Sequence, residues 1–181
     1  SAFLILLTVF SGYSQGNSAT TSDCGNPTPS QATGPYYTPG TPERASLLEN
    51  GIPGEKIVVT GRVVDRECEP MENVRLDFWQ ADGEGRYDNS GFQLRGHQYT
   101  DSDGRYRLET VRPAGYASRP PHIHVKVETP GGYRLTTQMY FPGEGQNGSD
   151  RLFDPALLVS MDYDDRRGTA QFDFVLDSVR Q

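Results

Sequence analysis

The sequence predicts an all-β protein, a two-sheet antiparallel β-sandwich with long loops and a few short helices. From residue 56 onward, short segments alternate apolar and polar residues, which is typical of strands with one buried face. Turn-forming residues separate these segments, and the chain contains 20 Gly and 13 Pro. Its length of 181 residues suits one domain with a sizeable core.

Six strands are expected in this domain. They are residues 56–64 (KIVVTGRVV), 74–80 (VRLDFWQ), 105–111 (RYRLETV), 122–128 (HIHVKVE), 134–141 (RLTTQMYF) and 169–176 (TAQFDFVL). Two of them place apolar residues at every second position, which marks a core-facing side: Val74, Leu76 and Phe78, and then Phe172, Phe174 and Leu176. Short helices are expected in residues 41–49 (TPERASLLE) and 154–161 (DPALLVSM).

The N-terminal residues 2–10 (AFLILLTVF) form an apolar run that is too short to span a bilayer but fits the core of a secretory signal. Gly12 and Ser14 suit cleavage just after Ser14. We therefore expect residues 1–14 to be part of a signal peptide, residues 15–55 an extension and residues 56–181 the domain. The alternative is a partly buried N-terminal strand. With a signal, the protein is secreted to the extracellular space or the periplasm.

The chain has two cysteines, Cys24 and Cys68. In an oxidising compartment such a pair favours a disulfide, which would tie the extension to the domain. On the loop-entropy model, closing a loop of this length stabilises the fold by roughly 4 kcal/mol. Two free thiols are the alternative.

The formal net charge of −7 argues against a nucleic-acid partner, because phosphate binding relies on clustered Lys and Arg. The sequence also has no basic run of the kind that binds anionic lipids. We therefore expect neither nucleic acid nor a membrane surface as a partner.

The stretch RPPHIHVKVE, residues 119–128, contains two of the three histidines. Alternation along a strand that starts at His122 puts His122 and His124 on one face, opposite the β-branched residues. Because the β-branched set takes the core side, these histidines are not expected to be core residues. They either lie on a solvated face, bond to a neighbouring loop or bind a metal.

Glu128 completes an H-x-H-x3-E pattern that resembles the first metal motif of the cupins. At about 3.3 Å per residue, however, Glu128 lies too far along the strand from His122 for one metal to bind both. The third histidine, His97, comes earlier in the chain, and none follows His124. A cupin-like site is therefore disfavoured, and Glu128 is expected to be a surface residue.

Two tyrosines lie in turns before the histidine strand: Tyr87 in FWQADGEGRYDN and Tyr116 in ETVRPAGYASRPPHIH. Phenolate is a hard anionic donor that suits a hard ion such as Fe(III). Because the pKa of free tyrosine is near 10, a strong Lewis acid is needed to keep it deprotonated at neutral pH. From the residues alone, ordinary turn aromatics are the favoured interpretation of both tyrosines.

Residues 24–176 resemble the intradiol ring-cleavage dioxygenases, the family of the catechol and protocatechuate 3,4-dioxygenases. The matching segments are TPSQATGPYY, GIPGEKIVVTGRVVD, LDFWQADGEGRYDN, YTDSDGRYRLETVRPAGY, RPPHIHVKV and LTTQMYFPGE, in the order and at the spacing of the family. The resemblance implies a β-sandwich that holds one non-haem Fe(III). Carried over by position, the iron ligands are Tyr87, Tyr116, His122 and His124.

The same resemblance assigns further roles. Arg119 matches the family's arginine before the histidines and would stabilise charge that develops on the ring, while Tyr116 would leave the iron and take a substrate proton. Gln138 and Tyr36, the latter in the GPYY segment that lines the site, are candidate substrate contacts. Only Ala117 and Ser118 separate Tyr116 from Arg119, fewer residues than in the protocatechuate enzymes, which implies a more open site.

The implied reaction is cleavage of a catechol-type ring by O2 between its two hydroxyl-bearing carbons, giving a cis,cis-muconate-type diacid. A second class remains open. The segment TDSDGRYRLETVRPAGY also resembles non-catalytic, prealbumin-like β-sandwich binding modules. Such a module gives no reason for Tyr87, Tyr116 and the histidine pair to occur together, so the dioxygenase interpretation is favoured.

Overall fold

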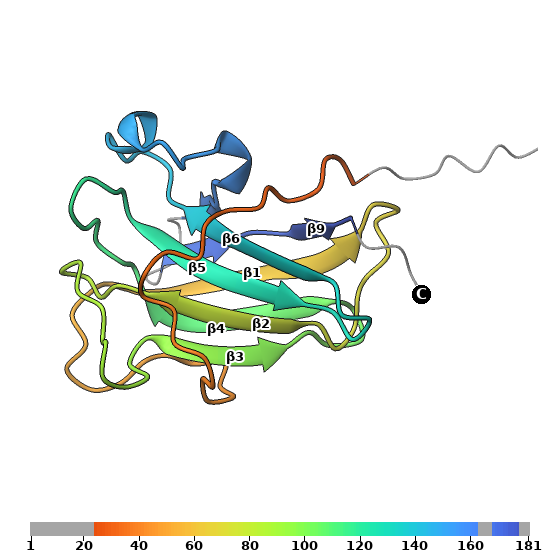
Figure 1. The fold of residues 1–181 in the computed structure, drawn as a ribbon, viewed down its shortest axis with the longest axis horizontal. Helices are drawn as coiled ribbons and strands as arrows, with labels where there is room; N and C mark the ends of the chain where they lie inside the picture. The colour runs from red at the N-terminus through yellow and green to blue at the C-terminus, as the bar shows by residue number, and fades with distance from the viewer. Residues whose placement is uncertain (1–23, 163–167, 178–181) are drawn as a thin grey trace, which may run out of the picture.

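The structure is a computed structural model that describes residues 24–162 and 168–177. Its regular elements, in chain order, are β1 (Lys56–Asp65), β2 (Arg75–Gln80), β3 (Arg95–Tyr99), β4 (Arg105–Val111), β5 (His122–Glu128), β6 (Arg134–Tyr140), the 3-10 helices η1 (Asn147–Ser149) and η2 (Pro155–Leu157), β7 (Ser160–Asp162), β8 (Gly168–Gln171) and β9 (Phe174–Leu176) (Figure 1). The predicted signal segment, residues 1–14, lies outside the described residues. Neither helix found in the described ranges is long and apolar enough to cross a membrane.

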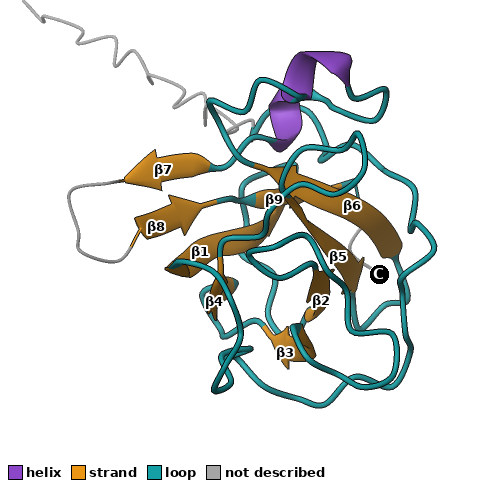
Figure 2. Ribbon diagram, turned by 90° about the vertical axis from the view of Figure 1, so that its left-hand side faces the viewer, coloured by secondary structure: helices purple, strands orange, loops and turns teal. Residues whose placement is uncertain are grey.

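Two sheets face each other, so the predicted β-sandwich is confirmed (Figure 2). One sheet has the order β3-β2-β5-β6 and is antiparallel throughout. The other has the order β4-β1-β8-β7, with β9 also paired to β1. This second sheet is mixed, because β1 is antiparallel to β4 but parallel to β8 and β9.

The core fills the space between the sheets, and both apolar faces predicted from alternation contribute to it. Val74, Leu76 and Phe78 are fully buried on the inner side of β2. Phe174 and Leu176 are also fully buried, and Phe172 is 7% exposed. The two stretches of apolar alternation therefore mark real core faces.

Several expected elements differ from those observed. Residues 41–49 are not helical, because they run as an extended loop that bridges Glu43 to His97 and Ser46 to Glu109. In the stretch 154–161 the predicted helix shrinks to η2, capped by Asp154, and is followed directly by β7. The expected strand 169–176 is divided into β8 and β9, which pair with different parts of β1.

Within the segment of residues 24–55, the stretch from Gln31 to Glu43 crosses the outer face of the antiparallel sheet from β6 to β3, and Figure 1 shows this stretch in orange in front of β5 and β2. Thr28 is hydrogen bonded to Val175 through both its backbone N–H and its hydroxyl, and Gln31 N donates to Thr136 O. Near its start this segment is tied by the predicted disulfide between Cys24 and Cys68. The segment therefore covers the sheet face on which the histidines lie.

Candidate metal centre

His122 and His124 lie at successive outward positions of β5. In register, His124 lies between Trp79 of β2 and Gln138 of β6, and His122 lies opposite Tyr140. Strand alternation is therefore as predicted, but this face is not solvated, since His122 and His124 are only 2% and 1% exposed. The covering segment explains this, because a Cβ on Gly34 would lie 3.5 Å from the His124 ring.

The geometry of the two imidazoles suits a shared metal ion. Their Nε2 atoms are 3.1 Å apart. Nitrogen ligands lie about 2.1 Å from a first-row metal, so two of them at right angles are about 3 Å apart. The Nδ1 atom of His122 is 2.7 Å from Pro120 O, to which it donates, so in the neutral ring Nε2 carries a lone pair and no proton.

Both imidazoles favour the neutral form that a metal requires. Burial, reinforced by the nearby Arg119 cation, lowers the pKa of His122 to about 4. Burial also lowers the pKa of His124, with His122 and Arg119 acting in the same direction. At neutral pH neither ring needs to lose a proton before it can bind a metal.

The two tyrosines come from neighbouring loops, residues 81–94 and 112–121, that meet above the histidines. Gly85 and Gly115 make this approach possible. A Cβ on Gly85, whose φ is +80°, would lie 2.5 Å from Gly115 O. One residue after Tyr116, Ala117 has a φ of +51°, which closes a tight turn in which Arg119 N donates to Tyr116 O.

The rings of these tyrosines lie beside the imidazoles. Ring centroids are 5.3 Å apart for Tyr87 and Tyr116, 5.6 Å for Tyr116 and His122, and 6.5 Å for Tyr87 and His124. The structure thus brings together the four side chains that the sequence analysis proposed as ligands.

The Tyr87 hydroxyl is buried and has no hydrogen-bond partner among the described residues. Burial, and then the proximity of Tyr116, raises its pKa far above the usual value. An unpartnered buried hydroxyl is unfavourable, so the site is incomplete without a further group. A bound cation next to this oxygen would satisfy it and reverse the pKa shift.

Arg119 extends over the histidine pair and contacts four polar side chains. Its Nη2 donates to Gln138 Oε1 and Tyr140 Oη, both at 2.7 Å, and to Asp150 Oδ2 at 2.9 Å. Its Nη1 is 3.3 Å from His122 Nε2. Burial lowers the pKa of this guanidinium, but the hydrogen bond to Asp150 and the charges of Tyr140, Asp150 and Tyr116 together outweigh burial, so the net shift is upward.

Tyr140 and Asp150 were not among the residues singled out in the sequence. Tyr140 could have been found, because it lies two positions after Gln138 in a strand and therefore shares its face. Asp150 follows η1 in an irregular loop, so no periodicity indicates it.

The two candidate substrate contacts are placed differently. Tyr36 stacks on Tyr87, with ring centroids 4.4 Å apart, and its edge faces Tyr116 at 5.7 Å. Gln138 is fully buried, and both ends of its amide are used, since Nε2 donates to Ala32 O and Oε1 accepts from Arg119. Tyr36 borders the site, whereas Gln138 lies under Arg119.

The residues of the cupin alternative lie elsewhere. Glu128 pairs with the exposed Arg134 at 2.8 Å, and His97 contacts Thr41. Within the described ranges, no group of three or more His, Cys, Asp or Glu side chains could hold a metal ion. In this part of the chain the histidine pair can be completed only by other donors, and the adjacent donors are the two phenols.

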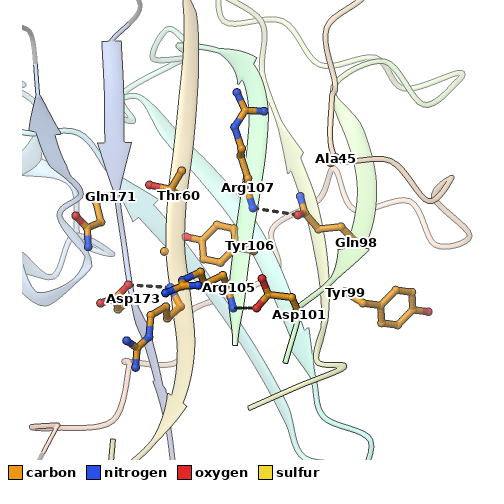
Figure 3. A pocket seen from close by; sticks show the side chains of 12 residues that line it. Ala45, Thr60, Gln98, Tyr99, Asp101, Arg105, Tyr106, Arg107, Gln171 and Asp173 are labelled. Carbon is orange, nitrogen blue, oxygen red and sulfur yellow. Dashed lines mark hydrogen bonds between the residues drawn. The ribbon is translucent and has the colours of Figure 1, made fainter. Parts of the chain in front are cut away.

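An open groove of about 620 Å³ lies on the other sheet and is lined from β1, β4, β8 and the edge of β3 (Figure 3). Its polar network includes the Arg107 N–H, which donates to Gln98 Oε1, and the Arg105 N–H, which donates to Asp101 Oδ1. None of the twelve residues that line it is a histidine. The groove is therefore separate from the candidate metal centre.

Fold and site together define a β-sandwich protein with a candidate metal centre of two imidazoles and two phenols. A family model described as Dioxygenase matches residues 32–178. The chain belongs to the family of intradiol ring-cleavage dioxygenases.

Curated relatives agree with this assignment. The chain is 40% identical over 129 residues to the protocatechuate 3,4-dioxygenase beta chain of Burkholderia cepacia, covering 60% of this chain and 54% of that protein. It is 33% identical over 147 residues to a catechol 1,2-dioxygenase of Candida albicans, covering 66% of this chain and 48% of that protein. The chain thus spans about half the length of these relatives.

Solved structures agree as well. The dioxygenase domain of a dioxygenase carbohydrate-binding protein fusion from the cellulolytic bacterium Streptomyces sp. SirexAA-E superposes with a TM-score of 0.82 at 49% identity, covering 85% of this chain and 100% of that chain. A 3-chlorocatechol 1,2-dioxygenase from Rhodococcus opacus superposes with a TM-score of 0.77 at 31% identity, covering 82% of this chain and 71% of that chain.

Proposed function

We propose that this protein is an Fe(III)-dependent intradiol dioxygenase that uses O2 to cleave a catechol-type ring between its two hydroxyl-bearing carbons. The product is a cis,cis-muconate-type diacid that contains both oxygen atoms of O2. The observation that carries the proposal is the unpartnered, buried Tyr87 hydroxyl beside two neutral imidazoles whose Nε2 atoms are 3.1 Å apart. Membership of the family supports the same reaction.

The iron would be held by His122 Nε2, His124 Nε2 and the phenolate oxygens of Tyr87 and Tyr116. When bound there, Fe(III) is a Lewis acid that keeps phenolic oxygens deprotonated at neutral pH and draws electron density from a chelated catecholate. Two phenolates and two neutral imidazoles match its charge and hardness better than zinc, which prefers nitrogen and sulfur ligands.

The two tyrosines differ in their freedom to move. Tyr87 is covered by the stacked Tyr36 ring, and its hydroxyl is buried. Tyr116 precedes the exposed residues Ala117 and Ser118 in a short turn. Tyr116 Oη is therefore the group that takes up one substrate hydroxyl proton, while Tyr87 stays in place.

Arg119 supplies fixed positive charge beside the histidine pair. Its guanidinium is held from one side by Asp150 and from the other by Gln138 and Tyr140, so it needs little reorganisation as negative charge develops on the ring. One electrostatic contact of this kind typically lowers a barrier by about 3 kcal/mol. Gln138 acts here through Arg119, since its own amide is already hydrogen bonded.

The substrate is an aromatic ring with two adjacent hydroxyl groups. This class is supported by relatives named catechol 1,2-dioxygenase and hydroxyquinol 1,2-dioxygenase. Tyr36 borders the space in front of Tyr87 and Tyr116 and would contact the substrate ring. The short turn between Tyr116 and Arg119 consists of the exposed residues Ala117 and Ser118, and so small a turn would accommodate catechols with a bulky substituent.

The decisive experiment is the visible spectrum of the purified, iron-loaded protein. A broad tyrosinate charge-transfer band is expected, and Tyr87→Phe or Tyr116→Phe should shift or abolish it. Tyr99→Phe is the control, because Tyr99 is 44% exposed on a strand outside the site. A colourless protein that contains only zinc, or no metal, would overturn the proposal and favour a non-catalytic binding module.

Turnover is tested by oxygen uptake with catechol. Intradiol cleavage gives a muconate that absorbs in the ultraviolet, at one O2 per catechol. A yellow semialdehyde would instead show cleavage beside the hydroxyl-bearing carbons and would contradict the proposed position of attack.

We also propose that the protein is exported from the cytoplasm. The apolar residues 2–10 and the Cys24–Cys68 disulfide support this, because disulfides persist in oxidising compartments. Cell fractionation of the native host with an antibody to the domain tests it, and recovery of the protein with reduced thiols in the cytoplasm would contradict it.

A further inference from the structure

Arg95, the first residue of β3, is an arginine buried beside the candidate metal centre. Only 1% of it is exposed. Its guanidinium donates to main-chain carbonyls, through Nε and Nη2 to Asp88 O at 3.1 and 2.7 Å and through Nη1 to Tyr36 O. One side chain thus joins the segment after Tyr87 to the segment that carries Tyr36.

This guanidinium has no carboxylate oxygen within ion-pair distance among the described residues. The carboxylate of Asp88 is already used, because it accepts from the N–H groups of Ser90, Gly91 and Gln93. A buried cation without an anion is strongly unfavourable, and arginine stays protonated in proteins. Burial lowers the pKa of Arg95, and the charges of Asp88, Tyr87 and Asp77, in this order, act against burial.

Of these three groups, Tyr87 is the one whose charge depends on a bound metal, because it is neutral as a phenol and negative as a metal-bound phenolate. The Arg95 guanidinium carbon lies 5.9 Å from the centre of the Tyr87 ring. A neutral ring offers it only a weak cation–π contact, whereas a phenolate would offer a full opposite charge in a buried environment. Tyr87 as a metal-bound phenolate therefore adds an anion beside this buried cation.

The backbone before Arg95 is arranged to direct it there. Leu94 is only 2% exposed and has a φ of +54°, a conformation that is unusual for a bulky residue and is retained where the surroundings require it. In register Arg95 lies opposite Trp79, which stacks on His124 with ring centroids 4.7 Å apart. Arg95 therefore begins a row of side chains that ends at the histidine pair.

We propose that Arg95 is a positioning residue of the metal centre, which holds Tyr87 and Tyr36 in their stacked arrangement and provides the positive charge that stabilises Tyr87 as a phenolate ligand. This inference rests on the proposed function, because it takes Tyr87 to be an iron ligand. Arg119 serves the opposite side of the site, since its contacts are with His122, Gln138, Tyr140 and Asp150.

Two variants of Arg95 separate charge from packing. Arg95→Gln removes the charge and is expected to move the tyrosinate band to longer wavelength, because the phenolate donor orbitals rise in energy when the nearby cation is lost. It should also speed loss of iron to a competing chelator by about 10-fold or more, as for other groups that support metal ligands. Arg95→Lys keeps the charge but cannot span both carbonyls, so the band should stay near its original energy while KM rises.

Arg75→Gln is the matched control. Arg75 lies on the same outer sheet face and is also partly buried, but it pairs with Asp77 at 3.1 Å. The Arg75→Gln substitution should lower the melting temperature without moving the tyrosinate band. In a Tyr87→Phe background, Arg95→Gln should produce no further shift, because the phenolate it acts on is gone.

The outcomes are distinguishable. A wild-type protein with no tyrosinate band refutes the proposed function itself. A wild-type band that is unchanged in a folded Arg95→Gln protein, with iron loss within twofold of wild type, refutes only the role of Arg95. If Arg95→Gln does not fold, the tyrosinate band of Arg95→Lys tests the role of Arg95. A shift of the band in Arg95→Lys as large as that in Tyr87→Phe would contradict the proposal.

Discussion

Asp150 fixes the orientation of Arg119. Its Oδ2 accepts from both Nε and Nη2 of Arg119, at 3.1 and 2.9 Å, and the two side chains are only 6% and 16% exposed. The other oxygen, Oδ1, accepts from the Leu152 N–H and holds the carboxylate in place. The arginine expected to face the reacting ring is thus fixed by a loop that follows β6 in sequence.

Replacing Asp150 should impair catalysis more than binding. In Asp150→Asn the amide can still accept one bond, but the charge that orients Arg119 is lost, so kcat should fall by about 10- to 100-fold with a small change in KM. Steady-state oxygen uptake measures both constants. Asp154→Asn is the control, because Asp154 caps η2 instead. An unchanged kcat in Asp150→Asn would show that Arg119 does not depend on this pair.

Gly85→Ala should separate the two tyrosine loops. The added Cβ would lie 2.5 Å from Gly115 O, and the φ of +80° is unfavourable for alanine. We expect a loss of about 2 to 4 kcal/mol in the free energy of unfolding, together with a loss of bound iron. Gly132→Ala is the matched control, since it has a φ of +87° but nothing within 4 Å. Equal effects of the two changes would show that backbone strain alone, and not the contact between loops, is responsible.

The buried histidines should make the metal-free protein acid-sensitive. The folded-state pKa of His122 is lowered to about 4, below its unfolded value near 6.5, so the unfolded chain binds more protons between these values. Stability is therefore full above pH 6.5 and falls as the pH drops toward 4, by about 3 kcal/mol for this residue. Denaturant unfolding at a series of pH values measures the slope. His122→Asn should flatten it over this window, and an unchanged slope would contradict the assignment.

Strands with strict apolar alternation could be predicted from the sequence, because one face of each is buried against the other sheet. β4 and β5 were predicted with their observed bounds. β3 was missed since its core-facing positions are Gly96 and Gln98, which give no apolar signal. The parallel pairing of β1 with β8 joins strands far apart in the chain, and local patterns carry no information about such partners.

For the candidate site, too, local sequence patterns predict only part of the arrangement. Alternation placed His122 and His124 on one face, but it could not show that the N-terminal segment buries them. Family motifs supplied Tyr87 and Tyr116, whose loops meet through Gly85 and Gly115 in a way that no spacing reveals. Arg95 and Asp150 carry no motif at all. Their part depends on hydrogen bonds to carbonyls and to Arg119 that exist only in the folded chain.

The Cys24–Cys68 disulfide should stabilise the fold without being needed for the site. It closes a span of 44 residues, so its removal should lower the free energy of unfolding by roughly 4 kcal/mol. The covering segment has its own anchors nearer the site, because Gln31 N donates to Thr136 O and Tyr37 Oη donates to the buried Asp77 at 3.0 Å. The double variant Cys24→Ser, Cys68→Ser should therefore melt at a lower temperature yet keep its iron content and KM.

Tyr37→Phe, which removes an anchor beside Tyr36, should instead raise KM with a smaller change in melting temperature. If the double serine variant raised KM as much as Tyr37→Phe does, the disulfide and not Asp77 would hold the segment over the histidines.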